Sequence, residues 1–466
     1  MNNTKMETFF RQMQGKRIAF CGIGGSNLPL VKLFHKKGAQ VAACDKRPRE
    51  ALGAAAGELE QMGIPLHLGE TYLQGLDVDI LFRTPGMPFT LPELTQARQK
   101  GIAVTSEMEV FFDLCPCKIY GVTGSDGKTT TTTILAEFLR AAGKTVHLGG
   151  NIGRPLLPEI EAIGPEDVAV VELSSFQLIS MRRSPDVAVV TNLSPNHLDV
   201  HKDMEEYVQA KKNIFLHQTA FSKTVLSCDN ELTRAFFPEI RGQALGFSRR
   251  EACAWGAWRS PEGKIYWSAG GERVPVLDET DIRLPGRHNL ENYLAAIAAA
   301  FGDVPPEAMR QVAKEFAGVP HRAELVRVCG GVSYYNDSIA TSPTRTIQGT
   351  LSMYPQKILL IAGGYDKHIP YDAIGPAILE KAKALILLGD TAEAIQAAVE
   401  NAPGYRPGIL PIVRVSSMEE AVEAARSLAK EGDIVSLSPA SASFDRYPNF
   451  EARGNHFKEL VQQIQA

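Results

Sequence analysis

Residues 121–133 read G-V-T-G-S-D-G-K-T-T-T-T-T, and their glycine, lysine and threonine order is typical of a loop that binds nucleotide phosphates. A β-rich stretch at 118–122 precedes the loop, and an amphipathic helix follows it. Backbone N–H groups at the start of that helix would point at phosphate oxygens, and the helix dipole would favour the anion. The stretch therefore predicts a nucleotide site at a strand-to-helix turn.

The start of this loop departs from the pattern G-x-x-x-x-G-K-[ST], because Val122 stands where the first glycine belongs. The alternative is a glycine turn with a surface lysine. Threonines fill positions 129–133, and they are poor helix formers, so helix stability gives little reason for them. We favour phosphate binding, with Lys128 directed at the outer phosphates and the Thr129 hydroxyl available to Mg²⁺.

The composition is that of an ordinary soluble globular protein, and 466 residues predict about three domains at roughly 150 residues each. A formal net charge of −4 argues against a broad nucleic-acid surface. Seven scattered cysteines predict reduced thiols and no disulfide framework. The N-terminal residues lack an apolar signal core, and no apolar run approaches about 18 residues, so we expect a cytoplasmic protein without membrane spans.

Strands alternating with helices in three successive segments predict parallel α/β layers. An aromatic-flanked Pro-Glu-Gly turn adds a hairpin over 255–267, a helix opens near His288, and 318–322 is the expected linker. The expected strands are 17–21, 41–44, 118–122, 146–148, 168–171, 187–190, 357–361, 384–388, 412–415 and 434–437.

The loop C-G-I-G-G-S-N at 21–27 is a weaker signal, because Asn27 stands where a dinucleotide fingerprint has its third glycine. Asp45 ends the next expected strand, where such a fold holds a ribose hydroxyl. The loop could serve NAD, another nucleotide diphosphate, or only a tight turn. We weight the last two above the first.

Candidate metal ligands follow two strands of the central segment. Glu172 ends one apolar strand, and His197, Asp199 and His201 follow the next. Because the carboxyl ends of parallel strands meet at one edge of a sheet, these groups are expected beside the phosphate loop. From the residues alone, Lys211 and Lys212 read as a solvated helix face.

Ten stretches occur in an order that resembles the Mur ligases of peptidoglycan synthesis, over nearly the whole chain. They are T-G-S-D-G-K-T-T, G-G-N-I-G, E-L-S-S-F-Q-L, N-H-L-D, Y-V-Q-A-K-K, L-P-G-R-H-N-L-E-N, G-V-P-H-R-A-E, Y-N-D-S, G-G-Y-D-K and S-P-A-S-A-S-F-D-R-Y-P-N-F-E-A-R-G. The third and the last are most similar to the branch that adds D-glutamate to UDP-N-acetylmuramoyl-L-alanine. In this family the loop has the pattern T-G-x-x-G-K-[ST], which requires no glycine at position 122 and so accounts for Val122.

The resemblance implies an α/β protein of three domains, each a mainly parallel sheet with flanking helices. A Rossmann-like domain at 1–112 would bind the UDP-sugar precursor, a P-loop ATPase domain would span 113–318, and a Rossmann-like domain at 319–466 would bind the amino acid. It also implies ATP and two Mg²⁺ ions as cofactors, an acyl-phosphate intermediate, and a monomer.

The resemblance also assigns residues to roles. The catalytic set is Lys128, Glu172, His197 and Lys211, and the metal ligands are Thr129, Glu172, His197 and Lys211 as a carbamate. The ATP set is Gly124, Ser125, Asp126, Gly127, Lys128, Thr129 and Thr130, with Asn289 and Asn292 near adenine and Arg322 and Asp337 at the triphosphate and ribose. The substrate set is Gly22, Gly24, Ser26, Asp45 and Lys46 for uridine diphosphate, Asn151 near the precursor, and Thr341, Lys367, Ser443 and Phe450 for D-glutamate.

Three positions depart from the family pattern. Asp126 stands where asparagine is frequent, so its carboxylate should point away from the triphosphate or to the metal. Ile339 replaces a lysine, and G-I-G-G-S-N partly resembles the L-alanine-adding branch. The alternatives are a sister ligase with another amino acid, a polyglutamate-forming relative, a P-loop switch or binding protein, and a nicotinamide oxidoreductase. The lack of an N-K-x-D motif argues against a GTPase.

Overall fold

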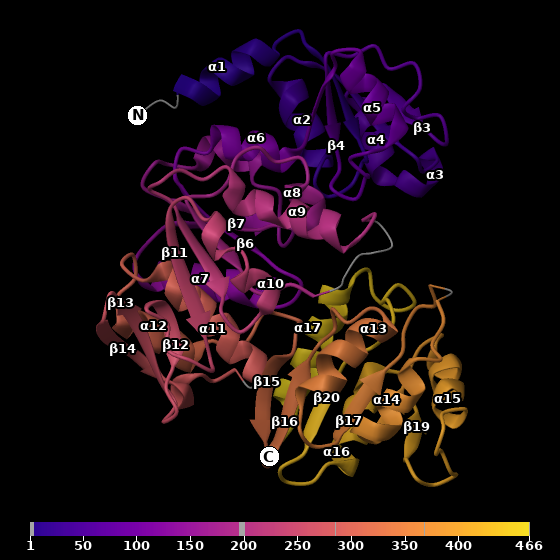
Figure 1. Ribbon diagram of the computed structural model, residues 1–466. Helices are drawn as coiled ribbons and strands as arrows, with labels where there is room; N and C mark the ends of the chain where they lie inside the picture. Colours follow the sequence, from indigo (N-terminus) through magenta and orange to yellow (C-terminus); the bar gives the residue numbers. More distant parts are fainter. Residues whose placement is uncertain (1–3, 195–200, 285, 368, 466) are drawn as a thin grey trace. The chain divides into compact units, whose positions relative to one another are not determined.

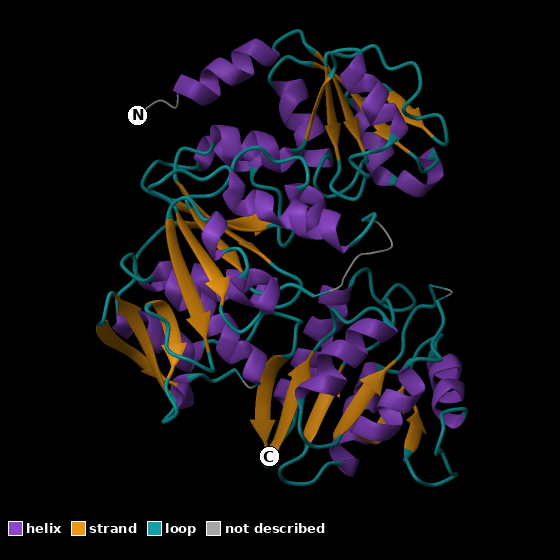
Figure 2. Cartoon of the chain, in the orientation of Figure 1, coloured by secondary structure: helices purple, strands orange, loops and turns teal. Residues whose placement is uncertain are grey.

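The computed structural model describes residues 4–194, 201–284, 286–367 and 369–465. The chain divides into two compact units. Unit 1 comprises Met1–Ile282 with Arg287–Lys314, and unit 2 comprises Arg283–Gly286 with Glu315–Ala466. Figure 1 labels the elements along the chain, and Figure 2 separates helices from strands.

The first sheet of unit 1 has five parallel strands in the order β3-β2-β1-β4-β5. Its strands are β1 (Arg17–Cys21), β2 (Gln40–Asp45), β3 (Leu66–Leu68), β4 (Ile80–Arg83) and β5 (Ala103–Thr105). Its helices are α1 (Thr4–Met13), α2 (Leu28–Lys36), α3 (Arg49–Leu52), α4 (Ala54–Gln61), α5 (Pro92–Gln99) and α6 (Glu107–Leu114). Phe20, Phe34 and Phe82 lie in contact between this sheet and α2, which explains why the helix docks there.

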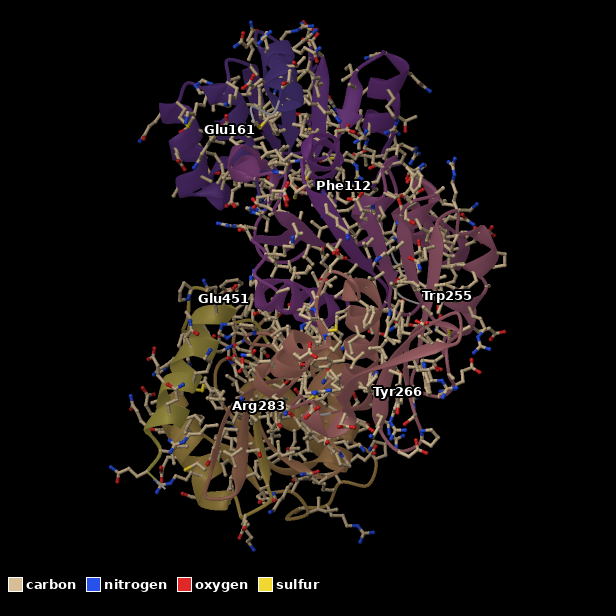
Figure 3. All side chains as sticks on the ribbon, turned by 90° about the vertical axis from the view of Figure 1, so that its left-hand side faces the viewer. Phe112, Glu161, Trp255, Tyr266, Arg283 and Glu451 are labelled. Atoms are coloured by element: carbon tan, nitrogen blue, oxygen red, sulfur yellow. The ribbon has the colours of Figure 1, made fainter. Side chains whose placement is uncertain are left out.

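The second sheet of unit 1 has nine strands in the order β14-β13-β12-β11-β10-β9-β6-β8-β7. They are β6 (Lys118–Thr123), β7 (Val146–Gly150), β8 (Val168–Glu172), β9 (Val187–Val190), β10 (Lys223–Ser227), β11 (Gln243–Ser248), β12 (Trp255–Arg259), β13 (Lys264–Ala269) and β14 (Glu272–Asp278). β6 to β12 pair in parallel, whereas β13 and β14 extend the sheet in antiparallel fashion. Figure 3 labels Trp255 on β12 and Tyr266 on β13.

The helices of the second sheet's domain include two that position the phosphate loop. α7 (Lys128–Ala141) follows the loop, and α11 (Arg287–Ala300) packs beside it. The apolar face expected of α7 is confirmed, because Ile134, Leu135, Phe138 and Leu139 are fully buried. The other helices are η1 (Leu157–Ala162), α8 (Ser175–Leu178), α9 (Met204–Leu216), α10 (Glu231–Arg234), η2 (Phe237–Glu239), η3 (Glu279–Asp281) and α12 (Pro306–Glu315).

Unit 2 holds a six-stranded sheet in the order β15-β16-β20-β17-β18-β19. Its strands are β15 (Glu324–Cys329), β16 (Val332–Asn336), β17 (Ile358–Ala362), β18 (Ala382–Leu387), β19 (Ile412–Arg414) and β20 (Ile434–Leu437). Only β15 pairs in antiparallel fashion within this sheet of the described chain. The helices are α13 (Pro343–Thr346), η4 (Ile347–Leu351), α14 (Ile374–Lys381), α15 (Ala392–Glu400), α16 (Met418–Leu428) and α17 (Phe450–Gln463).

The predicted fold class is confirmed: three mainly parallel α/β sheets with flanking helices are present. Each strand expected from the sequence corresponds to a strand, and the hairpin over 255–267 is present as β12 and β13. All seven cysteines are free thiols. Among the described residues, no helix is long and apolar enough to cross a bilayer.

Candidate active site

The phosphate loop connects β6 to α7 in the geometry that its glycines require. Gly127 caps the helix with a φ of 78°, and Gly124 has a φ of 150°. A Cβ on Gly124 would lie 1.9 Å from the Thr191 hydroxyl oxygen. Val122 lies inside β6, fully buried and paired with Glu172. The loop therefore needs its glycine at position 124, and Val122 is an ordinary strand residue.

The loop backbone is held from the end of β9. The Thr191 hydroxyl donates to the Asp126 carbonyl oxygen at 2.6 Å, and the Asn192 side-chain amide donates to the same oxygen at 3.1 Å. The Asp126 N–H donates to the Asn192 side-chain oxygen at 3.0 Å. The Asp126 residue itself is exposed. This acidic residue is thus held through its backbone, and the expected direction of its carboxylate, away from the triphosphate or to the metal, stays a prediction.

Lys128 bonds back to the loop, and the threonines after it bond within α7. The Lys128 ammonium donates to the carbonyl oxygens of Gly124 and Ser125 at 3.0 and 2.9 Å. The hydroxyls of Thr132 and Thr133 donate to carbonyls one turn earlier, at 2.7 and 2.8 Å. These bonds explain how a threonine-rich segment forms a helix, because the hydroxyls are satisfied within α7 itself.

Glu172 ends β8 beside the loop and is 1% exposed. One carboxylate oxygen accepts from the Asn151 side-chain amide at 2.7 Å. The other oxygen, Oε2, is buried and has no hydrogen-bond partner among the described residues. A buried carboxylate oxygen without a donor is costly, and a bound cation would satisfy it. This arrangement suits a divalent metal at the strand end.

Lys211 is buried beside the phosphate loop, so its interpretation as part of a solvated helix face is wrong. It is 2% exposed, and its ammonium donates to the Thr123 hydroxyl at 3.1 Å and the Gly124 carbonyl at 2.8 Å. The amine lies 4.9 Å from the centre of the Tyr207 ring. Burial, together with the nearby Lys128 charge, holds the pKa of Lys211 well below its usual range. Burial therefore favours the neutral amine.

Lys212 is separate from this group and pairs with Glu239 at 2.5 Å. Two of the three residues expected to follow β9, His197 and Asp199, lie outside the described residues. The third, His201, is 4% exposed, bonds to the Ser175 hydroxyl at 2.9 Å and stacks on the Phe176 ring. Within the described ranges, no cluster of three or more histidine, cysteine or acidic side chains could hold a metal.

Asn289 and Asn292, the residues expected near adenine, lie on α11 against the loop. Both are buried, and the Asn292 amide donates to the Asn289 side-chain oxygen at 3.1 Å. The Thr131 hydroxyl donates to the Asn292 side-chain oxygen, also at 3.1 Å. A Cβ on Gly127 would lie 2.3 Å from that oxygen. The structure thus brings Asn292 directly to the phosphate loop and Asn289 beside Asn292.

The first sheet carries the loop at 22–27 at the carboxyl end of β1. Gly22 has a φ of 93°, and a Cβ there would lie 2.7 Å from the Thr84 methyl group. Asn27, in place of a glycine, donates to the Cys21 carbonyl oxygen at 3.0 Å and so fastens the loop. Gly24, Ser26 and Lys46 line the same edge, where Lys46 is exposed.

Asp45 holds this loop from the end of β2. One carboxylate oxygen accepts from the Ile23 N–H at 2.7 Å, and both oxygens accept from Arg47. Burial alone would raise the pKa of Asp45, but the hydrogen bonds from Arg47 and Ile23 lower it overall. Asp45 therefore stays ionised and organises the loop through Ile23.

In unit 2, Asp337 is buried and accepts from the Thr350 hydroxyl at 2.7 Å and the Ser438 hydroxyl at 3.0 Å. Burial raises the pKa of its carboxyl. Arg322 is close enough that its charge acts on Asp337. The structure thus places these two predicted residues together.

The residues expected to bind D-glutamate also gather in unit 2. The Lys367 ammonium lies 3.5 Å from the Thr341 carbonyl oxygen. Arg453 donates to the carbonyl oxygens of Ser338 and Ala442, next to Ser443, and the Ser338 hydroxyl donates to the Phe450 carbonyl oxygen. Arg453 thus joins the loops that carry Thr341, Ser443 and Phe450.

The sequence-based sets lack several residues of this machinery, among them Thr191, Asn192, Tyr207 and Arg453. Their contacts join segments far apart in the chain. The Tyr207 hydroxyl, for example, lies 2.9 Å from the Ser125 hydroxyl, 82 residues away. The tyrosine of Y-V-Q-A-K-K and the arginine of F-E-A-R-G were available as signals, because both stand in stretches that carry the resemblance.

The three sheets with their flanking helices define a three-domain α/β protein, and a loop with the phosphate-binding pattern connects β6 to α7. Three family profiles match it in order: "Mur ligase MurD-like, N-terminal domain" over 16–106, "Mur ligase middle domain" over 122–300, and "Mur ligase, glutamate ligase domain" over 321–441. A curated relative from Acetivibrio thermocellus is 50% identical, over 100% of both chains. The chain belongs to the Mur ligase family.

That relative is named UDP-N-acetylmuramoylalanine--D-glutamate ligase. So are relatives from Symbiobacterium thermophilum, 51% identical over 96% of this chain and 98% of the relative, and Clostridium botulinum, 48% identical over 99% of both. Among solved structures, UDP-N-acetylmuramate-alanine ligase from Thermotoga maritima has a TM-score of 0.56 at 18% identity, covering 96% of this chain and 99% of its own. A pseudomurein peptide ligase type C from Methanothermus fervidus has a TM-score of 0.53 at 20% identity, covering 97% and 100%. The structural likenesses support the fold.

Proposed function

We propose that the protein is an ATP-dependent ligase that joins D-glutamate to UDP-N-acetylmuramoyl-L-alanine and releases ADP and phosphate, in peptidoglycan synthesis. The observation that carries the proposal is the full-length identity of about half to relatives that bear this enzyme's name. The phosphate loop beside an unsatisfied buried carboxylate supports it independently.

ATP binds through the loop from Gly124 to Thr130. Backbone N–H groups at the start of α7 hold the phosphates, and Lys128 exchanges its two carbonyl acceptors for phosphate oxygens. Asn289 and Asn292 contact the adenine end, and Arg322 and Asp337 serve the triphosphate and ribose. Asp126 contributes its backbone to this loop, and its exposed side chain is assigned no phosphate contact.

Magnesium fits the residues at the end of β8. Thr129 is 6% exposed and offers a hydroxyl, and Glu172 offers the oxygen that has no donor in the described structure. His197 and carbamylated Lys211 would hold a second ion. Bound Mg²⁺ would neutralise charge on the phosphates and on the approaching carboxylate.

Lys211 suits carbamylation because its burial favours the neutral amine, the form that reacts with CO₂. The amine nitrogen forms a bond to the carbon of CO₂ and loses one proton, which gives an anionic carbamate. The negative charge of the carbamate would also be attracted to Lys128, whose positive charge disfavours a second cation there.

The reaction has two steps. A carboxylate oxygen of the L-alanyl group attacks the γ-phosphorus, the bond to the β-γ bridging oxygen breaks, and ADP leaves. The amine of D-glutamate, after losing a proton, attacks the acyl carbon, and phosphate leaves from the tetrahedral intermediate. Asn151 orients the precursor, whose uridine diphosphate occupies the edge formed by Gly22, Gly24, Ser26, Asp45 and Lys46. Thr341, Lys367, Ser443 and the backbone near Phe450 bind the two carboxylates of D-glutamate.

The proposal includes three domains with boundaries 1–112, 113–318 and 319–466, a monomeric state and a cytoplasmic location. The test is phosphate release from ATP with precursor and amino acid supplied singly and together. We expect release to require both UDP-N-acetylmuramoyl-L-alanine and D-glutamate. Release with L-lysine, meso-diaminopimelate or L-alanine in place of D-glutamate would instead identify a sister ligase.

A further inference from the structure

Arg83 is a buried cation of unit 1 that has no role in the reaction as described above. It is the last residue of β4 and is 1% exposed. Its register partner is Cys21, directly before the Gly22 loop. The strand order of this sheet reverses between β1 and β4, and ligands of open parallel sheets bind at such a reversal, outside the carboxyl ends. Arg83 therefore stands at the edge where the precursor is proposed to bind.

The guanidinium of Arg83 reaches out of its own domain. One nitrogen donates to the Phe176 carbonyl oxygen at 2.9 Å and to the Ser180 hydroxyl at 2.7 Å. Another lies 3.3 Å from the Met87 carbonyl oxygen. Phe176 and Ser180 belong to α8 and the turn that follows it, in the domain of the second sheet. A single side chain thus connects the ligand edge of one sheet to α8 beside the other.

Stability alone gives a poor reason for this arginine. Its hydrogen-bond acceptors are neutral, and its Nε has no partner among the described residues. Burial lowers the pKa of the guanidinium, because the charge is taken out of water without a carboxylate bonded to it. An apolar side chain of similar volume would commonly cost less in such a position.

The segment to which Arg83 donates hydrogen bonds lies next to the elements that carry the proposed metal ligands. α8 begins three residues after Glu172, and the Ser175 hydroxyl on α8 bonds to His201 at 2.9 Å. The Leu178 carbonyl oxygen accepts from Asn213 at 2.9 Å, on α9, the helix that also carries Lys211. A displacement of α8 would therefore shift both elements that carry proposed metal ligands.

We propose that Arg83 is a positioning residue: it fixes the precursor-binding edge of the first sheet at a set distance from α8, so that the bound precursor delivers its carboxylate beside Glu172. This inference rests on the proposed function. The precursor spans from its uridine end to its alanyl carboxylate, so the separation of the two domains within unit 1 sets where that carboxylate lies. Misplacement of a reacting group by about 1 Å can cost on the order of 100-fold in rate.

Four variants of the full chain test this role: Arg83→Met, Arg83→Lys, Ser180→Ala and the control Arg98→Met. Arg98 lies over the Phe89 ring at 4.4 Å, as Arg83 does at 5.7 Å, but Arg98 donates to the Phe89 carbonyl oxygen and the Thr95 hydroxyl, both within the first domain. Steady-state kinetics give kcat and the KM for each substrate. Calorimetry gives the Kd for UDP, which should occupy the precursor-binding edge of the first sheet but lacks the alanyl carboxylate that reacts. Hydrogen exchange of the α8 amides, with and without UDP, reports the coupling without any turnover.

We expect Arg83→Met to lower kcat at least about tenfold while the Kd for UDP and the KM for ATP stay within about twofold. Arg83→Lys should recover part of the rate, Ser180→Ala should lose about threefold, and Arg98→Met should match the wild type. UDP should slow exchange in α8 of the wild type and not of Arg83→Met. The inference is overturned if kcat is unchanged, or if UDP binding falls in parallel with kcat.

Two further outcomes are decisive, one for the role of Arg83 and one for the proposed function. If Arg83→Met does not fold, Arg83→Lys and Ser180→Ala decide, because both must lower kcat while leaving UDP binding intact. If the wild type fails to need D-glutamate and the UDP precursor, the proposed function falls, whereas the exchange of α8 amides still supports or overturns the coupling by Arg83.

Discussion

Replacing Glu172 with glutamine tests whether this carboxylate binds a metal ion or only stabilises the fold. The substitution keeps the shape of the side chain and its acceptor for Asn151, but it removes the charge of an oxygen that is buried without a donor. An unsatisfied buried polar group costs about 1–3 kcal/mol. The glutamine amide still leaves one buried polar group unpaired, so only the cost of the buried charge is removed, and Glu172→Gln should leave unit 1 as stable as the wild type or up to about 1 kcal/mol more stable without ligands. For a domain of roughly 200 residues, that gain raises Tm by about 2–4 °C.

The activity of Glu172→Gln should fall, although its stability without ligands is kept or raised. Loss of one group that stabilises developing charge typically costs about 100- to 1,000-fold in kcat. The assay is phosphate release with all three substrates over a range of Mg²⁺ concentrations, paired with thermal unfolding with and without Mg²⁺ and ADP. Mg²⁺ with ADP should raise the Tm of the wild type and have little effect on the variant.

Glu107→Gln is the matched control, because Glu107 is also a buried carboxylate of unit 1, at 5% exposed. Its Oε1 accepts from the N–H groups of Leu156 and Leu157, both at 2.9 Å, and an amide oxygen can keep both bonds. We expect normal activity from this control. Our reasoning is refuted if Glu172→Gln retains more than about a tenth of wild-type activity with an unchanged Mg²⁺ dependence.

Three other substitutions test separate parts of the structure. Lys211→Ala should lose most activity, and added bicarbonate should not restore it, since no amine remains to be carbamylated; full activity in the phosphate-release assay would exclude the carbamate role. Asp126→Asn should change the KM for ATP by less than about threefold, because residue 126 is exposed and its loop is held through the backbone; a larger change would place the carboxylate at the nucleotide. The hydrogen bond from His147 is the main cause that lowers the pKa of Asp167 below its ordinary 3.8, so the pair stabilises the fold fully above that pH and loses its contribution as pH falls through the lowered value. The wild-type advantage over Asp167→Asn in urea midpoint should thus shrink below about pH 4, and a constant difference would contradict the linkage.

Local patterns predicted most of the strands, because a buried parallel strand is a short apolar run that ends at turn residues. β8 and β9 are such runs, and both were expected within one residue of their observed ends. β10 and β11 were not expected, since each has polar residues among the apolar ones. Their place became clear only from pairing, which puts β10 between β9 and β11.

The residues of the candidate site also divide into those that the sequence predicted and those that it did not. Gly124, Gly127 and Lys128 were predictable because a phosphate loop needs backbone freedom and a cation at fixed spacing along one segment. The burial of Lys211 was not predictable from its own helix, where the adjacent Lys212 and Asn213 suggest a solvated face. Its amine reaches the Gly124 carbonyl across 87 residues, and that contact depends on how α9 packs against the sheet.

The sequence by itself determined the α/β class, the phosphate loop and, through ordered motifs, the resemblance to Mur ligases, because each of these is written in residues that lie near one another in the chain. Tertiary structure decided which oxygen of Glu172 lacks a donor, which lysine is taken out of water, and that Arg83 connects two domains. These properties depend on desolvation and on contacts between distant segments, and neither exists until the sheets and helices have packed.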